Sequence, residues 1–176
     1  SSFDFLSKLI EGNPESVSEM APKIIEWITS RVFESDGDVT NLKNDPILIE
    51  KTVLLLCSLL QKLEVDVSLF FPMIVQATPP TVLLKKSGKF FEVLIWMGQN
   101  GDADFGQQIA AAVIRLFSEP DNLIEKRNLT QDQVDQLKEL LQSLAGSIQN
   151  FSEFCAESCD NDEFKMTNLN NHVFQS

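Results

Sequence analysis

Several residue types that enzymes use for catalysis are scarce or missing in this sequence. The chain of 176 residues contains no tyrosine, and His172 is its single histidine. Serine and cysteine nucleophiles generally need a neighbouring histidine or another base to remove their proton. Because His172 lies only four residues from the end of the chain, the sequence offers no arrangement of this kind. We therefore expect no catalytic residues and a protein that is not an enzyme.

Phosphate-binding motifs and positive charge are also lacking. None of the seven glycines has the spacing of a Walker loop or a dinucleotide fingerprint, in which backbone N–H groups approach a phosphate. The 14 Lys and Arg residues stand against 26 Asp and Glu, which gives a formal net charge of −12. A protein that binds nucleic acids or anionic membranes needs a concentrated basic surface. The sequence thus predicts no cofactor and no nucleic-acid partner.

The three cysteines are too few, and odd in number, for a disulfide-stabilised secreted fold. This usage is typical of a reducing compartment, so we expect a cytoplasmic or nuclear protein. Cys155 and Cys159 are one helical turn apart and His172 follows them, but a structural zinc site needs four ligands at other spacings. We expect no metal. The chain begins with serine rather than methionine, which is typical of a fragment, so the absence of a targeting segment excludes nothing.

Long apolar runs are rare, and the strongest lies at residues 46–63, PILIEKTVLLLCSLLQKL. Its apolar side chains cover nearly the whole circumference of a helix, with a thin polar strip that includes Glu50 and Lys51. Such a helix must be covered by other elements. The charges interrupt it, and it falls short of the ~20 apolar residues of a membrane span. The run therefore predicts a buried central helix and no membrane span.

Helix start signals recur along the chain. Asn13–Pro14 and Asp45–Pro46 each pair a capping side chain with a proline at the first helical position. Apolar residues at helical spacing predict further helices at residues 2–11, 23–34 and 81–97, one beginning near Asp66, and one from residue 102 or 104 to residue 117. A polar loop is expected at residues 35–44.

The clearest local signal is the sequence LTQDQV at residues 129–134. Thr130 and Gln133 have the spacing of a capping box, and Leu129 with Val134 that of a hydrophobic staple. They predict a long helix over residues 131–157 whose apolar positions follow a heptad. These positions form a candidate partner or docking surface, called the seam below: Val134, Leu137, Leu141, Leu144, Ile148 and Phe151. A seam of this kind docks on the chain's own helices or pairs with another chain.

These patterns predict an all-α protein. Two proline-initiated segments begin about 35 residues apart, at Pro46 and Pro80, which is the rhythm of a right-handed α-solenoid of the HEAT or armadillo type. An irregular helical bundle explains the same pattern. Both alternatives contain the buried helix 46–63 and the long C-terminal helix. We expect one helical domain over residues 1–159, followed by a mobile or extended tail over residues 160–176, where periodicity is lost.

The missing catalytic and phosphate-binding motifs favour a non-enzymatic protein–protein interaction module, a helical domain of a larger scaffold or adaptor. Its partner is then another protein, or a second copy bound through the C-terminal helix. The alternative is a helical domain that binds an apolar small molecule or lipid in a cavity lined by phenylalanine, of which the chain has thirteen. Phenylalanine has no polar group to satisfy, so the same residues also suit plain core packing.

Overall fold

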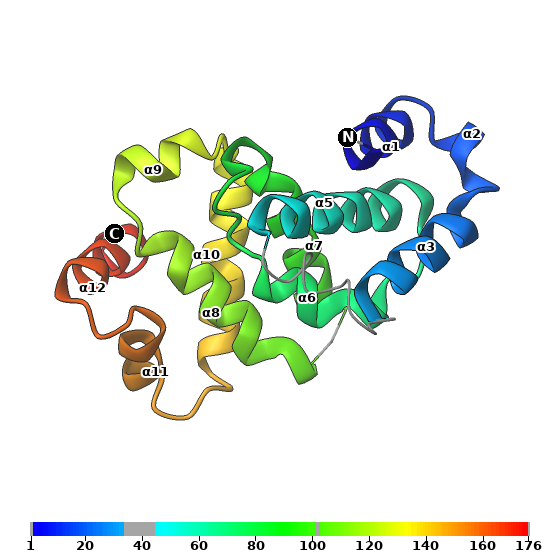
Figure 1. Ribbon diagram of the computed structural model, residues 1–176. Coiled ribbons are helices and arrows are strands. Elements are labelled where there is room, and N and C mark those ends of the chain that lie inside the picture. The colour runs from blue at the N-terminus through cyan, green and yellow to red at the C-terminus, as the bar shows by residue number, and fades with distance from the viewer. Residues whose placement is uncertain (1, 34–44, 101–102, 176) are drawn as a thin grey trace. The chain divides into compact units, whose positions relative to one another are not determined.

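The computed structural model describes residues 2–33, 45–100 and 103–175 (Figure 1). Helix accounts for 79% of these residues and they contain no strand, which confirms the all-α class. The chain divides into two compact units, Ser1–Leu83 and Leu84–Ser176. The choice between solenoid and bundle stays a prediction, and the loop expected at residues 35–44 lies outside the described residues.

Helix α5 (Pro46–Leu63) is the centre of the first unit and occupies the residues that the apolar run predicted. The Asp45 side chain caps it by accepting hydrogen bonds from the N–H groups of Ile47 and Leu48, at 3.0 and 3.2 Å. Residues 52–59 are buried without interruption. Because both faces of the helix are apolar, other elements must cover it from several sides.

Three preceding helices supply part of this cover. They are α1 (Ser2–Gly12), α2 (Pro14–Ser18) and α3 (Ala21–Phe33), and each contacts α5. Asn13 stands at the N-cap position of α2 with Pro14 in its first turn, as the sequence predicted, but the Asn13 side chain makes no capping hydrogen bond. The middle of α5 is buried, and the side chains of Leu55 and Leu59 have 0% exposure.

The first unit ends in η1 (Ser68–Phe70) and α6 (Phe71–Gln76). The Asp66 carboxylate accepts a hydrogen bond from the Ser68 N–H at 2.9 Å, so the capping signal near residue 66 has a structural counterpart. Pro72 lies in the first turn of α6, where its missing N–H costs nothing. It is therefore accommodated at the start of this helix, which begins at Phe71.

The helix predicted at residues 81–97 begins later than expected. It is preceded by η2 (Leu84–Lys86) and runs as α7 (Ser87–Gln99). Residues 81–83 stay outside it because their N–H groups donate to the carboxylate of Glu50, which lies more than thirty residues earlier in the chain. The apolar period alone gave no indication of this long-range acceptor.

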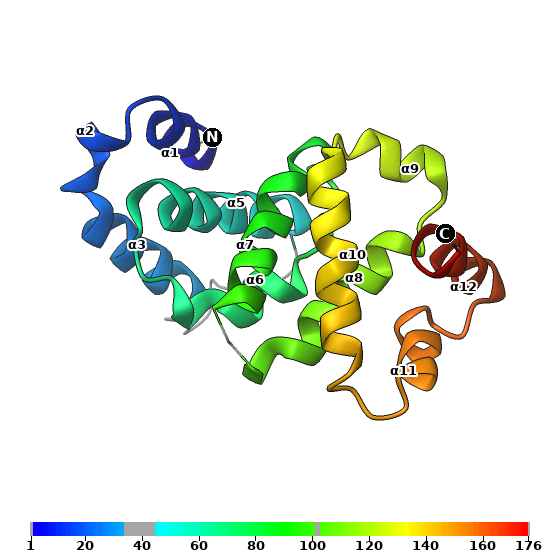
Figure 2. The same ribbon diagram turned by 180° about the vertical axis from the view of Figure 1, so that it is seen from behind.

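Helix α8 (Gly106–Phe117) is the centre of the second unit. It follows η3 (Ala103–Phe105), and seven of its twelve residues are buried. It contacts α7, α10 (Gln131–Ala145), α11 (Phe151–Ser158) and α12 (Glu163–Leu169). The short α9 (Asp121–Lys126) joins α8 to α10. Figure 2 shows α10 lying across α7 and α8.

The prediction of one continuous helix over residues 131–157 is wrong. The capping box at its start is present, with Gln133 N–H donating to Thr130 Oγ1 at 3.1 Å and Thr130 N–H donating to Gln133 Oε1 at 3.0 Å. However, α10 ends at Ala145 and Asn150 adopts a left-handed φ of 53° before α11 begins. Residues such as Gly146 and Asn150 are weak helix formers, and the break lets α11 pack back on α8.

Residues 163–174, which the sequence analysis assigned to a mobile or extended tail, are helical. They form α12 and the π-helical turn η4 (Asn170–Phe174). The Asp162 carboxylate caps α12 by accepting hydrogen bonds from Phe164 N–H and Lys165 N–H, at 2.9 and 3.1 Å. Leu169 is 1% exposed, so this segment buries apolar surface like the rest of the unit. The extent of the domain, residues 1–159, stays a prediction.

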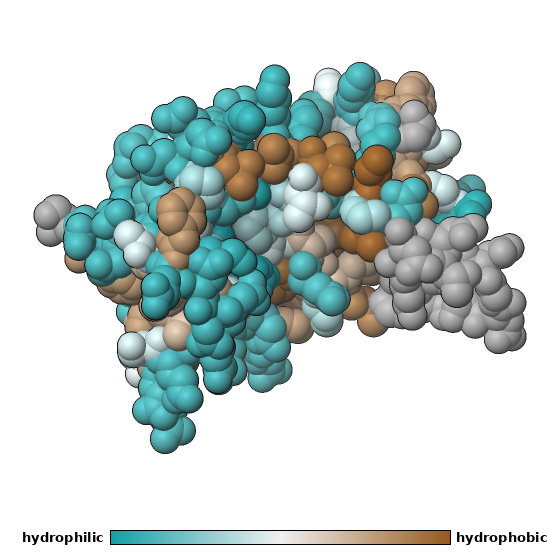
Figure 3. Space-filling model, turned by 60° about the vertical axis from the view of Figure 1, so that its left-hand side comes forward, coloured by the Kyte–Doolittle hydropathy of each residue, from teal (hydrophilic) through white to brown (hydrophobic). Residues whose placement is uncertain are grey.

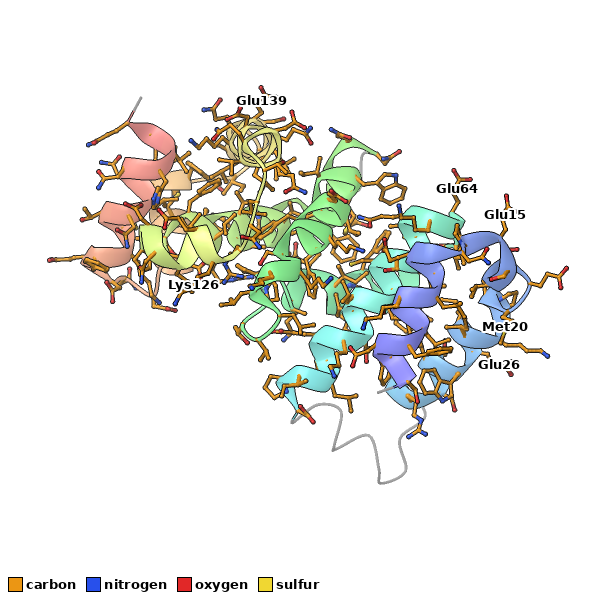
Figure 4. The ribbon with its side chains drawn as sticks, turned by 90° about the horizontal axis from the view of Figure 1, so that it is seen from above. Glu15, Met20, Glu26, Glu64, Lys126 and Glu139 are labelled. Carbon is orange, nitrogen blue, oxygen red and sulfur yellow. The ribbon has the colours of Figure 1, made fainter. Side chains whose placement is uncertain are left out.

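Acidic side chains outnumber basic ones in this chain, 26 Asp and Glu against 14 Lys and Arg, and exposed acidic side chains occur in both units. Figure 4 shows Glu15 and Glu26 in the first unit, and Lys126 and Glu139 in the second, with their side chains directed outwards. Figure 3 shows polar side chains in teal over most of the face drawn, with brown apolar side chains gathered in its upper part. None of the helices described is both long enough and apolar enough to cross a membrane.

Candidate functional site

An open groove in the second unit lies between α11 on one side and α12 with η4 on the other. It encloses about 540 Å³. Its apolar lining consists of Phe151, Cys155, Met166, Leu169 and Phe174. Amide side chains from η4 and the residue after it add hydrogen-bonding groups to the same wall. We call this feature the C-terminal groove.

The helical period explains why these side chains meet. Phe151 and Cys155 are four residues apart on α11, and Met166 and Leu169 are three apart on α12, so each pair shares one face of its helix. The ring of Phe151 meets the ring of Phe174 edge-on, with centroids 6.2 Å apart and planes at 78°. This is a favourable aromatic geometry. Phe174 nevertheless remains 48% exposed, so the groove presents an aromatic surface to solvent.

The π-helical turn shapes the wall formed by η4. Gln175 N–H donates to the carbonyl of Asn170, five residues back, at 2.9 Å, which is the hydrogen bond that defines a π-helix. Single π-turns are frequent at functional sites. Here the wide turn places Asn170, Asn171 and Gln175 along the groove. Each amide offers both a donor and an acceptor.

Two polar side chains attach this segment to the body of the unit. The amide of Asn168 donates to the Ser118 carbonyl at 3.1 Å. The ring of His172 lies between two oxygens, with Nδ1 2.9 Å from the Phe117 carbonyl and Nε2 2.6 Å from Asp121 Oδ1. The wall of the groove is therefore held by the C-terminal end of α8 and the first residue of α9.

The thiols near the groove are poor nucleophiles. Burial, with a smaller contribution from the neighbouring Cys159, raises the pKa of Cys155 to about 11. Burial also raises the pKa of Cys159. Because both pKa values are raised, both thiols stay protonated near neutral pH. Only the thiolate form of cysteine reacts or binds metal. The described residues contain no group of three or more His, Cys, Asp or Glu side chains able to hold a metal ion.

Exposed acidic side chains lie on the segments that border the groove. They are on α11, in the turn that leads into α12 and at the start of α12: Glu153, Glu157, Asp160, Asp162 and Glu163. Over residues 151–175 the basic counterpart is Lys165, whose Nζ lies 2.7 Å from Asp160 Oδ2. The hydrogen bond from Lys165 lowers the pKa of Asp160. These bordering segments, called the acidic rim below, thus carry a net negative charge at neutral pH.

The structure divides the seam residues between two settings. Leu137 and Leu141 on α10 are fully buried, and Ile148 in the connector after α10 is 8% exposed. Val134 and Leu144 are half-buried. Phe151 alone among the six lines the C-terminal groove. The seam is therefore not one continuous stripe, because the chain turns between α10 and α11.

Sequence reasoning missed the groove residues after residue 160, including the apolar Met166, Leu169 and Phe174, because it assigned this segment to a tail. A signal for α12 was nevertheless present. Asp162 followed by Glu163, with apolar residues at 166 and 169, is a helix-start pattern. The position of Phe174 had no such signal, since the π-turn depends on contacts with α8 and α9.

Sequence reasoning also missed a buried polar cluster around Arg127. Arg127 is 3% exposed and donates from Nε and Nη2 to the two carboxylate oxygens of Glu119, both at 2.7 Å, and from Nη1 to Ser87 Oγ at 2.9 Å. A two-pronged pair of this geometry satisfies both charges. The cluster fastens the end of α9 to the start of α7 and has the character of a structural support.

We found no protein-family model, curated protein or solved structure that matches this chain. The all-helical fold and the geometry of the C-terminal groove are therefore the features that bear on function.

Proposed function

We propose that the chain is a non-enzymatic protein–protein interaction module, and that its C-terminal groove receives a partner segment with an apolar anchor flanked by lysine or arginine. The observation that carries this proposal is the groove itself. It is open, it has an apolar floor, and it exposes nearly half of Phe174. An aromatic side chain in such a setting is typical of an energetic hot spot at a protein interface.

The polar groups around the groove favour a peptide as the occupant. Asn170, Asn171 and Gln175 can both donate to and accept from a peptide backbone, which a purely hydrocarbon ligand would leave unsatisfied. The acidic rim attracts positive charge and repels acidic segments. Complementary charge of this kind raises the rate of association and the specificity of binding.

The seam on α10 is the other candidate surface, and the burial pattern favours docking within the unit. Helix α10 contacts α7 and α8, and Leu137 and Leu141 have no exposed area. A partner that used these side chains would first have to displace α10. The C-terminal groove needs no such rearrangement.

The test uses two synthetic amphipathic peptides with the same leucine face, one with lysine and one with glutamate at its polar positions. Fluorescence anisotropy measures binding to the full chain. We expect the lysine peptide to bind and the glutamate peptide to bind at least about tenfold more weakly, which corresponds to about 1.4 kcal/mol. Equal binding of both peptides contradicts the role of the acidic rim, and binding of neither contradicts the proposed function.

A matched pair of variants locates the binding surface. Phe174→Ser removes the exposed ring inside the groove, and Phe164→Ser removes a 66% exposed ring on α12 outside the groove lining. We expect Phe174→Ser to weaken binding of the lysine peptide about tenfold or more, as for an interface hot spot. Phe164→Ser should leave it within about twofold. The reverse order would place the interface elsewhere.

A small apolar molecule is the second candidate occupant. The groove volume of about 540 Å³ falls within the ~300–1,000 Å³ of ligand pockets. The neutral dye Nile red is a suitable probe, since it carries no charge for the rim to attract. Saturable dye binding that is lost in Phe174→Ser, without any binding of the lysine peptide, would favour this second candidate.

A further inference from the structure

The single histidine of the chain has an unusual hydrogen-bonding environment. Both of its ring nitrogens face an oxygen that can only accept: Nδ1 lies 2.9 Å from the carbonyl of Phe117, and Nε2 lies 2.6 Å from a carboxylate oxygen of Asp121. The side chain of His172 is 22% exposed. Its ring also lies against that of Phe117, with centroids 6.4 Å apart.

A neutral imidazole cannot satisfy this arrangement. It carries one N–H group, and its other nitrogen has a lone pair that would face an acceptor oxygen. Only the doubly protonated imidazolium donates from both nitrogens. The contacts of His172 therefore select the cationic ring.

The other charged groups near the ring do not replace Asp121. On α10, Lys138 holds its Nζ 6.0 Å from the ring centroid of Phe117, the ring that His172 lies against. On α12, Lys165 is paired with Asp160. The elements packed around the ring also carry these charged side chains: Arg115 on α8, Glu125 and Lys126 on α9, and Glu163 on α12. Among the contacts of the ring, Asp121 supplies the opposite charge.

We propose that His172 is a proton-controlled latch: its protonation holds η4 against α8 and α9 and thereby forms one wall of the C-terminal groove. Histidine changes its charge between about pH 5 and 8. The latched state holds the proton, so by linkage its advantage is present at low pH and is lost as the pH rises through this range. As an account of partner binding, the latch rests on the function proposed above.

The effect of the latch is confined to residues 170–175. Two anchors just before these residues do not involve the ring of His172: Asn168 donates to the Ser118 carbonyl, and Leu169 is buried. Helix α12 is thus held independently of the ring. The groove residues Asn170, Asn171 and Phe174 lie beyond these anchors, on the same short turn as His172.

The first experiment examines the latch without any partner. Long-range nitrogen–proton NMR spectra of the full chain report the protonation and tautomer of its one imidazole ring. We expect these spectra to show both ring nitrogens as hydrogen-bond donors in the parent, and the Nε2 contact to be lost in Asp121→Asn. Glu125→Gln is the matched control, because it removes the same charge from the same helix without touching the ring, and its spectrum should match that of the parent. The same spectrum in all three proteins overturns the latch.

Amide exchange then tests whether η4 follows the ring. After correction for intrinsic exchange, protection of the amides of residues 170–175 should fall about tenfold between about pH 5.5 and 8, as expected for loss of one charge-assisted hydrogen bond. His172→Gln and Asp121→Asn should show the weaker protection at every pH. Protection that is independent of pH in the parent overturns the proposal.

Binding of the lysine peptide, with its N-terminus acetylated, separates the latch from the proposed function. Ordinary carboxylates and lysines keep their charges between about pH 5.5 and 8, so a change in affinity over this range reports on His172. We expect affinity to fall about tenfold with rising pH in the parent and to be independent of pH in His172→Gln. Affinity that is independent of pH in the parent overturns the coupling between His172 and the groove. If the peptide binds at no pH, the proposed function fails, while the NMR spectra of the ring and the amide exchange still decide the latch.

Discussion

At the scale of the residue, Glu50 shows how one buried carboxylate decides where a helix begins. It lies on α5 with 4% of its surface exposed, and its oxygens accept hydrogen bonds from the N–H groups of Thr81, Val82 and Leu83 and from the Thr81 hydroxyl. Burial of a charge is tolerated only where several donors surround it. The sequence analysis placed this residue in the thin polar strip of the helix but gave no indication of its partners.

Replacing Glu50 therefore tests the first unit. Glu50→Gln keeps the size of the side chain, but its NH₂ group cannot accept from the N–H groups of residues 81–83. We expect the free energy of unfolding to fall by about 1.5–3 kcal/mol, measured by urea denaturation. Glu26→Gln on the exposed side of α3 is the control and should change it by less than about 0.5 kcal/mol. Equal effects of the two substitutions would contradict the role of Glu50.

The raised pKa of Cys155 predicts a dependence of stability on alkaline pH. In the unfolded chain a thiol ionises at a pKa of about 8.5, whereas in the folded protein the pKa of Cys155 is about 11. Below about pH 8.5 both states hold the proton and the full stability is present. As the pH rises toward about 11, the unfolded state loses its proton first, so the free energy of unfolding falls.

The measurement compares parent and Cys155→Ala by urea denaturation at several values between about pH 7.5 and 10.5. Lysines also titrate in this range, so the informative quantity is the difference between the two proteins. We expect the stability of the parent to fall more steeply with pH than that of the variant. Parallel curves would show that the thiol has the same pKa in the folded and unfolded states.

At the scale of the element, glycine allows α10 to approach α7. A Cβ added at Gly98 would lie 2.5 Å from Leu140 Cδ1, whereas one added at Gly106 on α8 would meet Leu144 Cδ2 at an ordinary 3.5 Å. Leu140 lies beside the seam on α10. The close approach of the two helices thus depends on the absence of a side chain at Gly98.

This contact predicts a difference between two alanine substitutions. Gly98→Ala should be less stable than Gly106→Ala by about 1–3 kcal/mol, because the added methyl group overpacks the α7–α10 contact. The penalty should shrink in the Leu140→Ala background, since the clashing methyl group is then absent. Thermal and urea unfolding of the parent, Gly98→Ala, Leu140→Ala and the double variant measure this coupling. A penalty unchanged by Leu140→Ala would place the strain elsewhere.

At the scale of the whole molecule, the C-terminal residues contribute to the stability of the second unit. Leu169 is buried, and Asn168 and His172 bond to the end of α8. An extended tail would make none of these contacts. The segment therefore closes the unit as well as forming a wall of the groove.

Removing residues 163–176 should lower the melting temperature. Loss of one buried leucine alone costs about 1.5–3 kcal/mol, which for a chain of this size corresponds to a fall of about 4 °C or more. The point variants Leu169→Ala and Phe164→Ala separate burial from length, because Phe164 is mostly exposed. An unchanged melting temperature after truncation would support the extended tail that the sequence suggested.

Local interactions explain what could be predicted from the sequence alone. The all-α class, the bounds 46–63 of α5, the Asp45 cap and the Thr130–Gln133 capping box all depend on residues within a few positions of one another. Apolar period and cap chemistry act over the same short range. The sequence by itself therefore determined where most helices lie and which of them must be buried.

The tertiary structure decided the features that depend on residues far apart in the chain. The late start of α7 requires Glu50, 31 to 33 residues earlier, and the break after Ala145 accompanies the packing of α11 on α8. The C-terminal groove exists because Asn168 and His172 reach partners 50 or more positions away. No local pattern encodes such pairings, since the free energy that favours them arises only when the helices have packed.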